Sequence, residues 1–298
     1  MQRRAPDLSA APDRGQPRVL LDVPVSFDVG ERRTHAPMVK AVVNGTPTQL
    51  ILDTGSTDHV LTIALARAAG LKHVPTDPGT DHAGASVPTW RLGTVDATIG
   101  AQSLVLDNAV AIEGPAPFEG WGVGGFLSPQ HLHPTAHTVI DLHNNRLIMV
   151  EGDANAVARW LAARLPDHVQ LKLPRARQYL TIVVPAAIVP FGTVDTMLNT
   201  GGQHTEFAQT AVPSLRGPAP DVTGYGVSGV PVRGYEVRDR TLRVDGAKFK
   251  VATLLVRHDM DPPHGLVGMD LLAGTALMVS TDPTQPVVWM VPADTSSE

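Results

Sequence analysis

The chain has 298 residues, 43% apolar and 18% charged side chains and a net charge of −5, a globular balance that excludes a largely disordered protein. This mild acidity argues against a nucleic-acid or anionic-membrane partner, and no apolar run is long enough to span a bilayer. The absence of cysteine excludes disulfides, thiolate nucleophiles and Cys-based zinc sites.

The start of the chain is predicted to be a flexible leader. Residues 1–17 are rich in Ala, Pro, Arg and Asp, and they lack the apolar core of a signal peptide. A leader-like start and a lack of cysteine are compatible with export, so we expect a periplasmic or secreted protein.

Short strands are expected next, because Gly and Pro are frequent, at 27 and 26 residues. Residues 19–27 have apolar side chains at near-alternate positions, and Pro24 suits an edge strand. Residues 38–43 and 48–52 are predicted to form a pair of strands around a tight turn at Asn44-Gly45.

Only two helices are predicted with defined ends. Residues 62–69 form a short helix that Gly70 stops. Residues 155–165 form the clearest helix, with Asp153 as its cap and Pro166 as its stop. The rest of the chain reads as strand and loop, so the predicted fold class is mainly β with few short helices.

The second half of the chain repeats features of the first. Asp53-Thr54-Gly55 follows an apolar run, and Asn199-Thr200-Gly201 follows another about half a chain length later. A glycine motif comes after each loop, at residues 122–127 and 265–272. Each half then closes with a hairpin-like pair of strands. We therefore predict an internal duplication of a β unit.

This duplication predicts two similar β lobes with a cleft where they meet. We expect the leader at residues 1–17, an N-terminal lobe at 18–168 with the Asp53 loop, and a C-terminal lobe at 169–298 with the Asn199 loop. The boundary is placed after the helix at 155–165, because this helix lies between the two repeats.

The Asp53 loop has the residue types of an acid–base site. A carboxylate at the end of a buried strand is costly unless its surroundings satisfy it. Gly55 lets the backbone turn so that its N–H approaches the carboxylate, and the Thr54 hydroxyl can lock one loop against the other. Where two such loops bring two carboxyls together, one holds a proton while the other acts as a base toward water.

The run Leu-Ile-Leu-Asp-Thr-Gly-Ser-Thr at residues 50–57 resembles the motif of the aspartic peptidases. Gly-Leu-Val-Gly-Met-Asp-Leu-Leu at 265–272 is similar to the second motif of retropepsin-like members. In the first half, residues 139–147 resemble the strand that follows the glycine motif in such members. The resemblance covers about residues 35–150 and 175–292. It implies a pepsin-like bilobal chain made of two retropepsin-like halves related by a two-fold axis.

The resemblance also implies a function and a set of site residues. The chain would be an aspartic endopeptidase in which water activated at Asp53 attacks a peptide carbonyl. Position 199 would be the catalytic partner. The residues expected to shape the two loops are Thr54, Gly55, Thr200 and Gly201.

In this family, β-hairpins cover the cleft and contact the substrate. The candidates here are residues 82–92, which include Trp90, and residues 223–235, which include Tyr225 and Tyr235. The sequence does not decide which of them folds over a ligand.

Asn199 departs from the family pattern, which has a second Asp. An amide is nearly isosteric with a protonated carboxyl, but it cannot give up and recover an acidic proton. Loss of a positioned acid lowers a rate by on the order of 10²–10⁴. Three explanations stay open: an introduced substitution that inactivates the enzyme, a natural pseudo-peptidase that binds peptides, or a native Asn with weak activity. Asp195 is not the missing partner, because Thr-Gly does not follow it.

The expected partner is a peptide or protein substrate, with no nucleic acid and no cofactor. A monomer is expected, because the second lobe occupies the surface that a homodimer of single lobes would use. His131, His133, His137 and His143 lie close in sequence, but no carboxylates join them, so no metal site is predicted. His59 and His204 follow the two loops, and we expect them either to pack between the lobes or to tune the pH response of the cleft.

Overall fold

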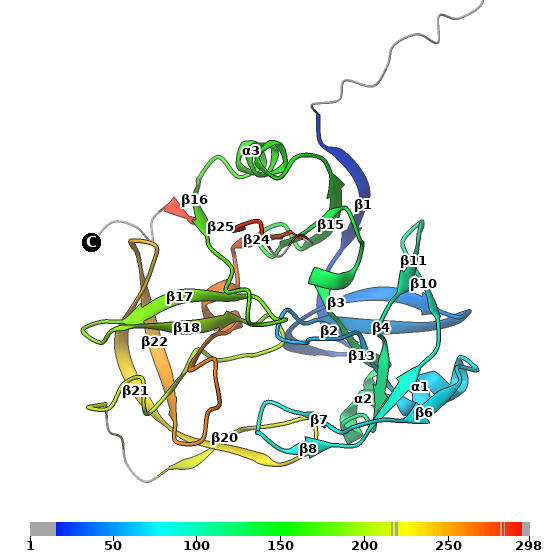
Figure 1. The fold of residues 1–298 in the computed structure, drawn as a ribbon, viewed down its shortest axis with the longest axis horizontal. Coiled ribbons are helices and arrows are strands. Elements are labelled where there is room, and N and C mark those ends of the chain that lie inside the picture. The colour runs from blue at the N-terminus through cyan, green and yellow to red at the C-terminus, as the bar shows by residue number, and fades with distance from the viewer. Residues whose placement is uncertain (1–15, 216, 218–219, 281, 283, 294–298) are drawn as a thin grey trace, which may run out of the picture.

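The computed structural model describes residues 16–215, 217, 220–280, 282 and 284–293. Residues 1–15 of the predicted leader and residues 294–298 of the predicted C-terminal lobe lie outside the described residues. The described chain is mainly β with few short helices, as predicted. Figure 1 shows its strands in three groups, with α3 above one of them and the other two at either side below.

The first half of the chain forms a ten-stranded sheet. Its order is β11-β10-β3-β4-β13-β5-β12-β9-β6, with β2 paired to β3. The predicted turn at Asn44-Gly45 joins β3 to β4, and both residues have positive φ, which Asn and Gly tolerate best. The strands are β2 (Ser26–Val29), β3 (Arg32–Val43), β4 (Thr46–Leu52), β5 (Val60–Thr62), β6 (His73–Pro75), β9 (Thr89–Leu92), β10 (Val95–Ile99), β11 (Gln102–Leu106), β12 (Val110–Ile112) and β13 (Val123–Leu127).

The second half forms a seven-stranded sheet in the order β17-β18-β23-β19-β22-β21-β20. Here β18 pairs with β23 in parallel, and β23 pairs with β19 antiparallel. The ten-stranded sheet has the same directions in β4, β13 and β5. The strands are β17 (Val183–Ile188), β18 (Thr193–Leu198), β19 (Glu206–Ala208), β20 (Asp221–Tyr225), β21 (Pro231–Val244), β22 (Ala247–Arg257) and β23 (Gly265–Val267).

A six-stranded sheet takes strands from both halves, in the order β1-β15-β14-β24-β25-β16. The antiparallel pairing of β14 with β24 joins the halves. Pro24 ends the edge strand β1, as predicted, because proline has no N–H to give to a second neighbour. The strands are β1 (Arg18–Pro24), β14 (His137–Asp141), β15 (Arg146–Glu151), β16 (His168–Leu173), β24 (Ala276–Val279) and β25 (Val287–Pro292).

Both predicted helices are present. α1 (Ile63–Ala68) is capped by the Thr62 hydroxyl, and α3 (Ala154–Arg164) is capped by the Asp153 carboxylate. The sequence did not predict three shorter turns, α2 (Ala116–Trp121), the 3₁₀ turn η1 (Pro129–His131) and α4 (Met269–Leu272), which are too short to show a helical period. No helix in the described part of the chain is long and apolar enough to cross a membrane.

The six-stranded sheet is buried on both faces. On one face it packs against α3 through Val157, Leu161 and Leu165. On the other, the fully buried Trp289 of β25 stacks on Phe249 of β22, with 5.0 Å between ring centroids. The main core continues from there into both larger sheets. The six-stranded sheet is therefore a base that fixes the two larger sheets relative to each other.

This packing predicts that Leu161→Ala lowers the free energy of unfolding by about 2–5 kcal/mol, because it leaves a cavity beneath α3. Arg159→Ala, on the exposed side of the same helix, is the matched control and should change stability by less than about 0.5 kcal/mol. Chemical denaturation measures both. Equal effects of the two substitutions would contradict the proposed packing.

Candidate active site

The loops that follow β4 and β18 are locked together by their threonines. The Thr54 hydroxyl donates to the Leu198 carbonyl at 2.6 Å, and the Thr200 hydroxyl donates to the Leu52 carbonyl at 2.6 Å. Each hydroxyl also accepts the backbone N–H of the other Thr, at 3.1 Å and 3.0 Å. Both side chains are fully buried. The hydroxyls therefore join the two loops in the way that the sequence predicts.

The glycine of each loop lies against the polar side chain of the other. A Cβ atom on Gly55 would come within 2.8 Å of Asn199 Cγ, and one on Gly201 would come within 2.5 Å of Asp53 Cγ. The Gly55 N–H donates to Asp53 Oδ1 at 2.8 Å, and the Gly201 N–H donates to Asn199 Oδ1 at 2.9 Å. The structure thus brings together Asp53 and Asn199, and only glycine leaves room for both.

Burial raises the pKa of the Asp53 carboxyl above its usual range. The Gly55 N–H and a charge on His82 act in the opposite direction, but desolvation outweighs them. A carboxyl acts as a base only when it is deprotonated. Because its pKa is raised, Asp53 becomes an ineffective base at a higher pH than an ordinary Asp does. No second carboxyl stands at position 199 to share the proton.

Hydrogen bonds fix the orientation of the Asn199 amide. Its Oδ1 accepts the N–H groups of Gly201 and Gly202, at 2.9 Å and 3.2 Å. No side chain or carbonyl among the described residues accepts a hydrogen bond from Nδ2. Asn199 therefore presents a neutral N–H donor where a protonated carboxyl would present an O–H donor, and the amide cannot release its proton.

A cavity of about 480 Å³ adjoins Asp53 and Asn199 and takes its walls from both halves of the chain. This volume lies within the usual range of ligand-binding pockets. Its walls are Asp53, Gly55, Ser56, Thr57, Asp58, Val60, Thr76, Asp77, Gly79, Thr80, Asp81, His82, Val87, Thr89, Val110, Ile112, Phe126, Met197, Asn199 and Val227.

A second cavity of about 1040 Å³ is more apolar and adjoins the first. Val87, Phe126 and Val227 line both cavities, and Gly201 lines the second. Its apolar walls include Met38, Ile51, Phe118, Trp121 and Val123. Together the two cavities make a groove that passes both loops.

Two hairpins meet over this groove. The first is formed by β7 (Gly79–Thr80) and β8 (Ser86–Val87), and the second joins β20 to β21. Asp81 at the tip of the first accepts hydrogen bonds from the Ser228 N–H and hydroxyl at the tip of the second, at 3.0 Å and 2.6 Å. Figure 1 shows β7 and β8 beside β20. The groove is therefore covered from both halves of the chain.

The predicted hairpin residues have different positions. Tyr225 lines the second cavity and is 68% exposed. Trp90 lies in β9, paired with Ala111, and lines neither cavity, because the first hairpin turns earlier than the sequence analysis assumed. Tyr235 is buried, and its hydroxyl bonds to Gln209 and the Leu215 carbonyl. Of the three aromatic candidates, only Tyr225 borders the groove.

The sequence analysis placed His82 in the candidate hairpin at residues 82–92 but gave it no role, and the structure shows that it lines the first cavity. Glu206 in β19 and Arg257 in β22 form a buried ion pair at 3.2 Å, and this pair contacts His82 from the other half of the chain. Since the three residues are far apart in the sequence, no local pattern shows their proximity. A histidine at the tip of a Gly-containing loop was the one available signal.

His59 is buried and neutral. The Ser128 N–H donates to its Nδ1 at 3.2 Å, so Nε2 carries the proton and donates to the His131 carbonyl at 3.2 Å. Burial lowers the pKa of His59 from its ordinary 6.5 to about 4. Its partners belong to the first half of the chain, whereas His204 borders a different pocket, of about 490 Å³.

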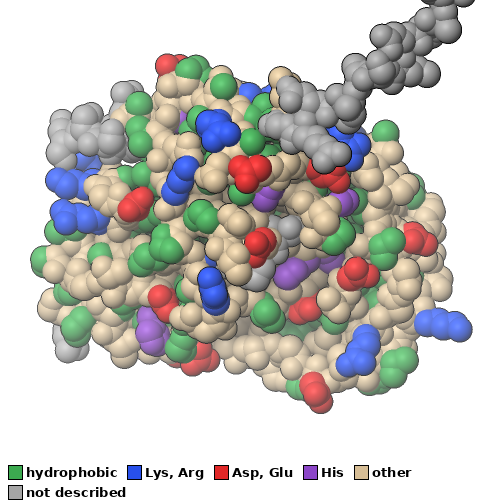
Figure 2. Space-filling view, turned by 45° about the horizontal axis from the view of Figure 1, so that its top comes forward, with side chains coloured by type: hydrophobic (Ala, Val, Ile, Leu, Met, Phe, Trp, Pro, Cys, Tyr) green, Lys and Arg blue, Asp and Glu red, His purple; other side chains and the backbone are tan. Residues whose placement is uncertain are grey.

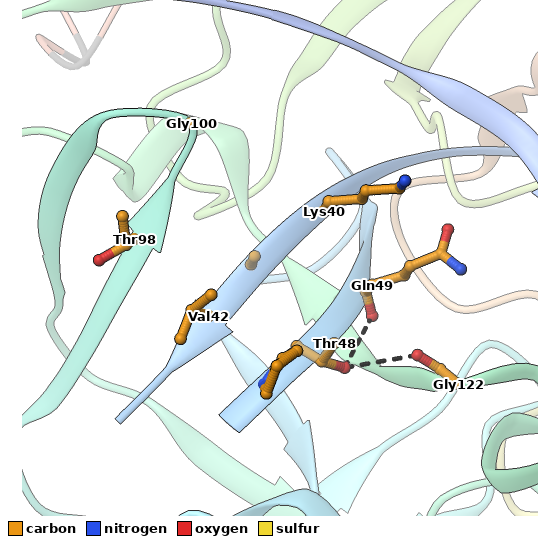
Figure 3. A pocket seen from close by; sticks show the side chains of 9 residues that line it. Lys40, Val42, Thr48, Gln49, Thr98, Gly100 and Gly122 are labelled. Atoms are coloured by element: carbon orange, nitrogen blue, oxygen red, sulfur yellow. Dashed lines mark hydrogen bonds between the residues drawn. The ribbon is translucent and has the colours of Figure 1, made fainter. Parts of the chain in front are cut away.

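The remaining surface features lie away from the loops. A pocket of about 540 Å³ on the exposed side of β3 and β4 is lined by Lys40, Thr48 and Gln49, and the Thr48 hydroxyl donates to the Gly122 carbonyl at its edge (Figure 3). Figure 2 shows acidic and basic side chains scattered over one face, with histidines near its middle. Within the described residues, no group of three or more His, Asp or Glu side chains is arranged to hold a metal ion.

Comparison with known proteins bears on the first loop. Residues 39–120 match a family model described as Aspartyl protease. The matched segment contains the Asp53 loop, α1 and the first hairpin, and it supports a relationship to the aspartyl protease superfamily and a protease-like function. A search of curated proteins gave no match.

The threonine lock predicts that Thr54→Val and Thr200→Val each lower the free energy of unfolding by roughly 2–5 kcal/mol, since each leaves a buried carbonyl and a buried N–H without a partner. Thr57→Val, whose hydroxyl bonds to Asp58 in an exposed position, should change it by less than about 0.5 kcal/mol. Urea denaturation gives the comparison. If Thr57→Val matched the other two, the lock would not be the stabilising element.

Burial of neutral His59 predicts a loss of stability in acid. Because its folded-state pKa of about 4 lies below 6.5, the unfolded chain binds more protons between these values. The stabilisation is complete above pH 6.5 and lost as the pH falls toward 4, by roughly 3 kcal/mol in total. His59→Asn, whose Oδ1 can accept the Ser128 N–H, should flatten this limb in denaturation curves. Parallel curves for the two proteins would refute the assignment.

Proposed function

We propose that the chain is an aspartic-type endopeptidase, weakened by Asn199, that hydrolyses peptide bonds with water activated at Asp53. The observation that carries this proposal is the pair of interlocked loops, which hold Asp53 and Asn199 beside a groove walled by both halves. The match of residues 39–120 to an aspartyl protease model supports it.

The chemistry follows from the two side chains. Ionised Asp53 takes a proton from water as the water oxygen attacks the peptide carbonyl. The free N–H of Asn199 donates to the carbonyl oxygen, on which negative charge develops. Asn199 cannot supply the proton that the leaving amine needs, so the site lacks half of the acid–base pair of a two-carboxyl enzyme.

The proposal includes a bilobal architecture with an approximate two-fold axis and a boundary near residues 168–169. The equivalent directions of β4-β13-β5 and β18-β23-β19 support the duplication, and the reciprocal bonds of Thr54 and Thr200 support the axis. A monomer is proposed because Thr54 finds its partner loop within the same chain.

Asn199 favours a second candidate function, a pseudo-peptidase that binds peptides in the same groove without cutting them. The Asn199 amide oxygen accepts the N–H groups of Gly201 and Gly202. The loop therefore keeps its hydrogen bonds with Asn at this position. A peptide-binding or regulatory module needs the groove and the hairpins but no proton donor.

The two functions are separated by comparing the wild-type chain with Asn199→Asp and Asp53→Asn on a mixed peptide library from pH 3 to 7, with products identified by mass spectrometry. Asn199→Asp should raise the rate in acid by on the order of 10²–10⁴, because a second carboxyl shares and returns the proton. Asp53→Asn should abolish cleavage in either background.

Binding of the same peptides, measured by fluorescence anisotropy, completes the experiment. If no variant cuts and all bind, the groove is a recognition site and the peptidase proposal is wrong. If no variant cuts or binds, both functions proposed for the groove are wrong.

A further inference from the structure

His82 is the one histidine among the side chains that line the cavity beside Asp53. The other titratable groups of this wall are Asp58, Asp77 and Asp81. Asp81 is occupied by the N–H groups of Ala83, Ala85 and Ser228. Histidine is the side chain that exchanges a proton most readily near neutral pH, so His82 has the chemistry that Asn199 lacks.

The ring of His82 is held by groups from the other half of the chain. The ring nitrogen Nε2 lies 3.2 Å from Glu206 Oε1. The backbone carbonyl of His82 accepts a hydrogen bond from Arg257 Nη1 at 3.0 Å. Glu206 and Arg257 are 6% and 2% exposed. Burying an ion pair is costly, so a buried pair that reaches a hairpin tip points to a positioning role.

Glu206 is kept ionised for this contact. Burial alone raises its pKa, but hydrogen bonds and charge interactions with His82 and Arg257 lower the pKa below the usual value. A carboxylate that accepts the proton of one ring nitrogen leaves the other nitrogen for a reacting group, as in other carboxylate–histidine pairs. Arg257 Nη1 also lies 3.2 Å from Nε2, but this group donates to the His82 carbonyl and to Glu206. Glu206 is then the acceptor for Nε2–H, and Nδ1 is the nitrogen left to act.

We propose that His82 is a catalytic acid of this site, which donates the proton to the leaving amine in place of a carboxyl at position 199. The inference rests on the proposed peptidase function and makes the third explanation of Asn199, a native Asn with weak activity, the one to test. It assigns three roles: Asp53 is the base, Asn199 the hydrogen-bond donor to the carbonyl oxygen, and His82 the acid.

The reaction balances with water as the only co-reactant. Asp53 accepts one proton of the water, and the hydroxide oxygen bonds to the carbonyl carbon. Protonated His82 gives its Nδ1 proton to the peptide nitrogen as the carbon–nitrogen bond breaks, which releases an amine and a carboxylic acid. The proton on Asp53 then returns to His82 through solvent, and both groups regain their starting states.

The charged groups around His82 are Glu206 and Arg257 from the second half, Asp81 from its own hairpin, and Asp53 across the cavity. A charge on His82 also lowers the pKa of Asp53. The two groups are thus electrostatically coupled, and a protonated His82 favours the ionised form of the base. Activity is therefore expected in a pH window with Asp53 ionised and His82 protonated.

The test measures kcat and KM against pH for the full chain and for His82→Gln, with a peptide that the wild type cleaves. Gln keeps a donor for Glu206 but holds no exchangeable acid. We expect kcat to fall by on the order of 10²–10⁴ with KM little changed, and the alkaline limb of the pH profile to disappear. The matched control is His73→Gln in β6. The ring of His73 bonds locally, to the Leu71 carbonyl, so this variant should keep the wild-type pH profile.

A rescue variant separates lost chemistry from lost structure. Adding Asn199→Asp to His82→Gln should restore kcat with an acidic optimum, because the second carboxyl then supplies the proton. Recovery of activity also shows that the variant is folded. Failure of this rescue, when Asn199→Asp alone is active, would show that His82→Gln damages the site and would overturn the assigned role.

The remaining outcomes distinguish the two proposals. If the wild type and His82→Gln cleave at the same rate with the same pH profile, His82 is not the acid, and the peptidase function stands. If Asn199→Asp cleaves and the wild type does not, His82 is not the acid, and the peptidase function holds only for the variant with two carboxyls. If neither the wild type nor Asn199→Asp cleaves any peptide, the peptidase function fails and the role of His82 fails with it.

Discussion

The reciprocal hydrogen bonds of Thr54 and Thr200 are the constraint on which the site depends. Each hydroxyl donates to a carbonyl at the end of the opposite strand and accepts the opposite backbone N–H. The buried N–H and C=O groups at the two strand ends thereby gain hydrogen-bond partners from the opposite loop. Since the loops are fixed at this point, Asp53 and Asn199 are fixed as well, and the walls of the groove follow from the sheets that carry them.

The two loops have nearly the same geometry and opposite chemistry. Gly55 and Gly201 hold Asp53 and Asn199 by equivalent N–H bonds at 2.8 Å and 2.9 Å, so the amide is not a misfit. The two side chains differ in acid–base chemistry, because the Asp53 carboxyl can exchange a proton and the Asn199 amide cannot. Burial leaves Asp53 with a raised pKa, and the missing acid must come from elsewhere in the groove if peptide bonds are cut. The buried ion pair of Glu206 and Arg257 draws attention to His82 for that reason.

The sequence was sufficient where structure is decided locally. The β3–β4 hairpin, the caps of α1 and α3 and the loop at Asp53 all follow from turn residues, apolar alternation and capping side chains. The sequence was insufficient where the structure depends on contacts between residues far apart in the chain. The first hairpin turns at residues 81–85, so Trp90 falls outside it, and Tyr235 is buried because β21 is a long core strand. His82 contacts Glu206 and Arg257, which are 124 and 175 residues away in the sequence, and no local sequence pattern predicts such contacts. The periplasmic or secreted location stays a prediction.

The pairing of β14 with β24 has a consequence for how a ligand gains access. A continuous backbone ladder runs between strands of the two halves, and α3 covers the sheet that contains it. Rotating the halves apart as rigid bodies would shear this ladder. Parting the two hairpin tips breaks, among the described residues, the bonds of Asp81 to Ser228 and of His82 to its ion pair. A ligand is therefore expected to enter where the hairpin tips meet, and not by separation of the two halves. A motion of two short hairpins is also a much faster and smaller event than a domain motion.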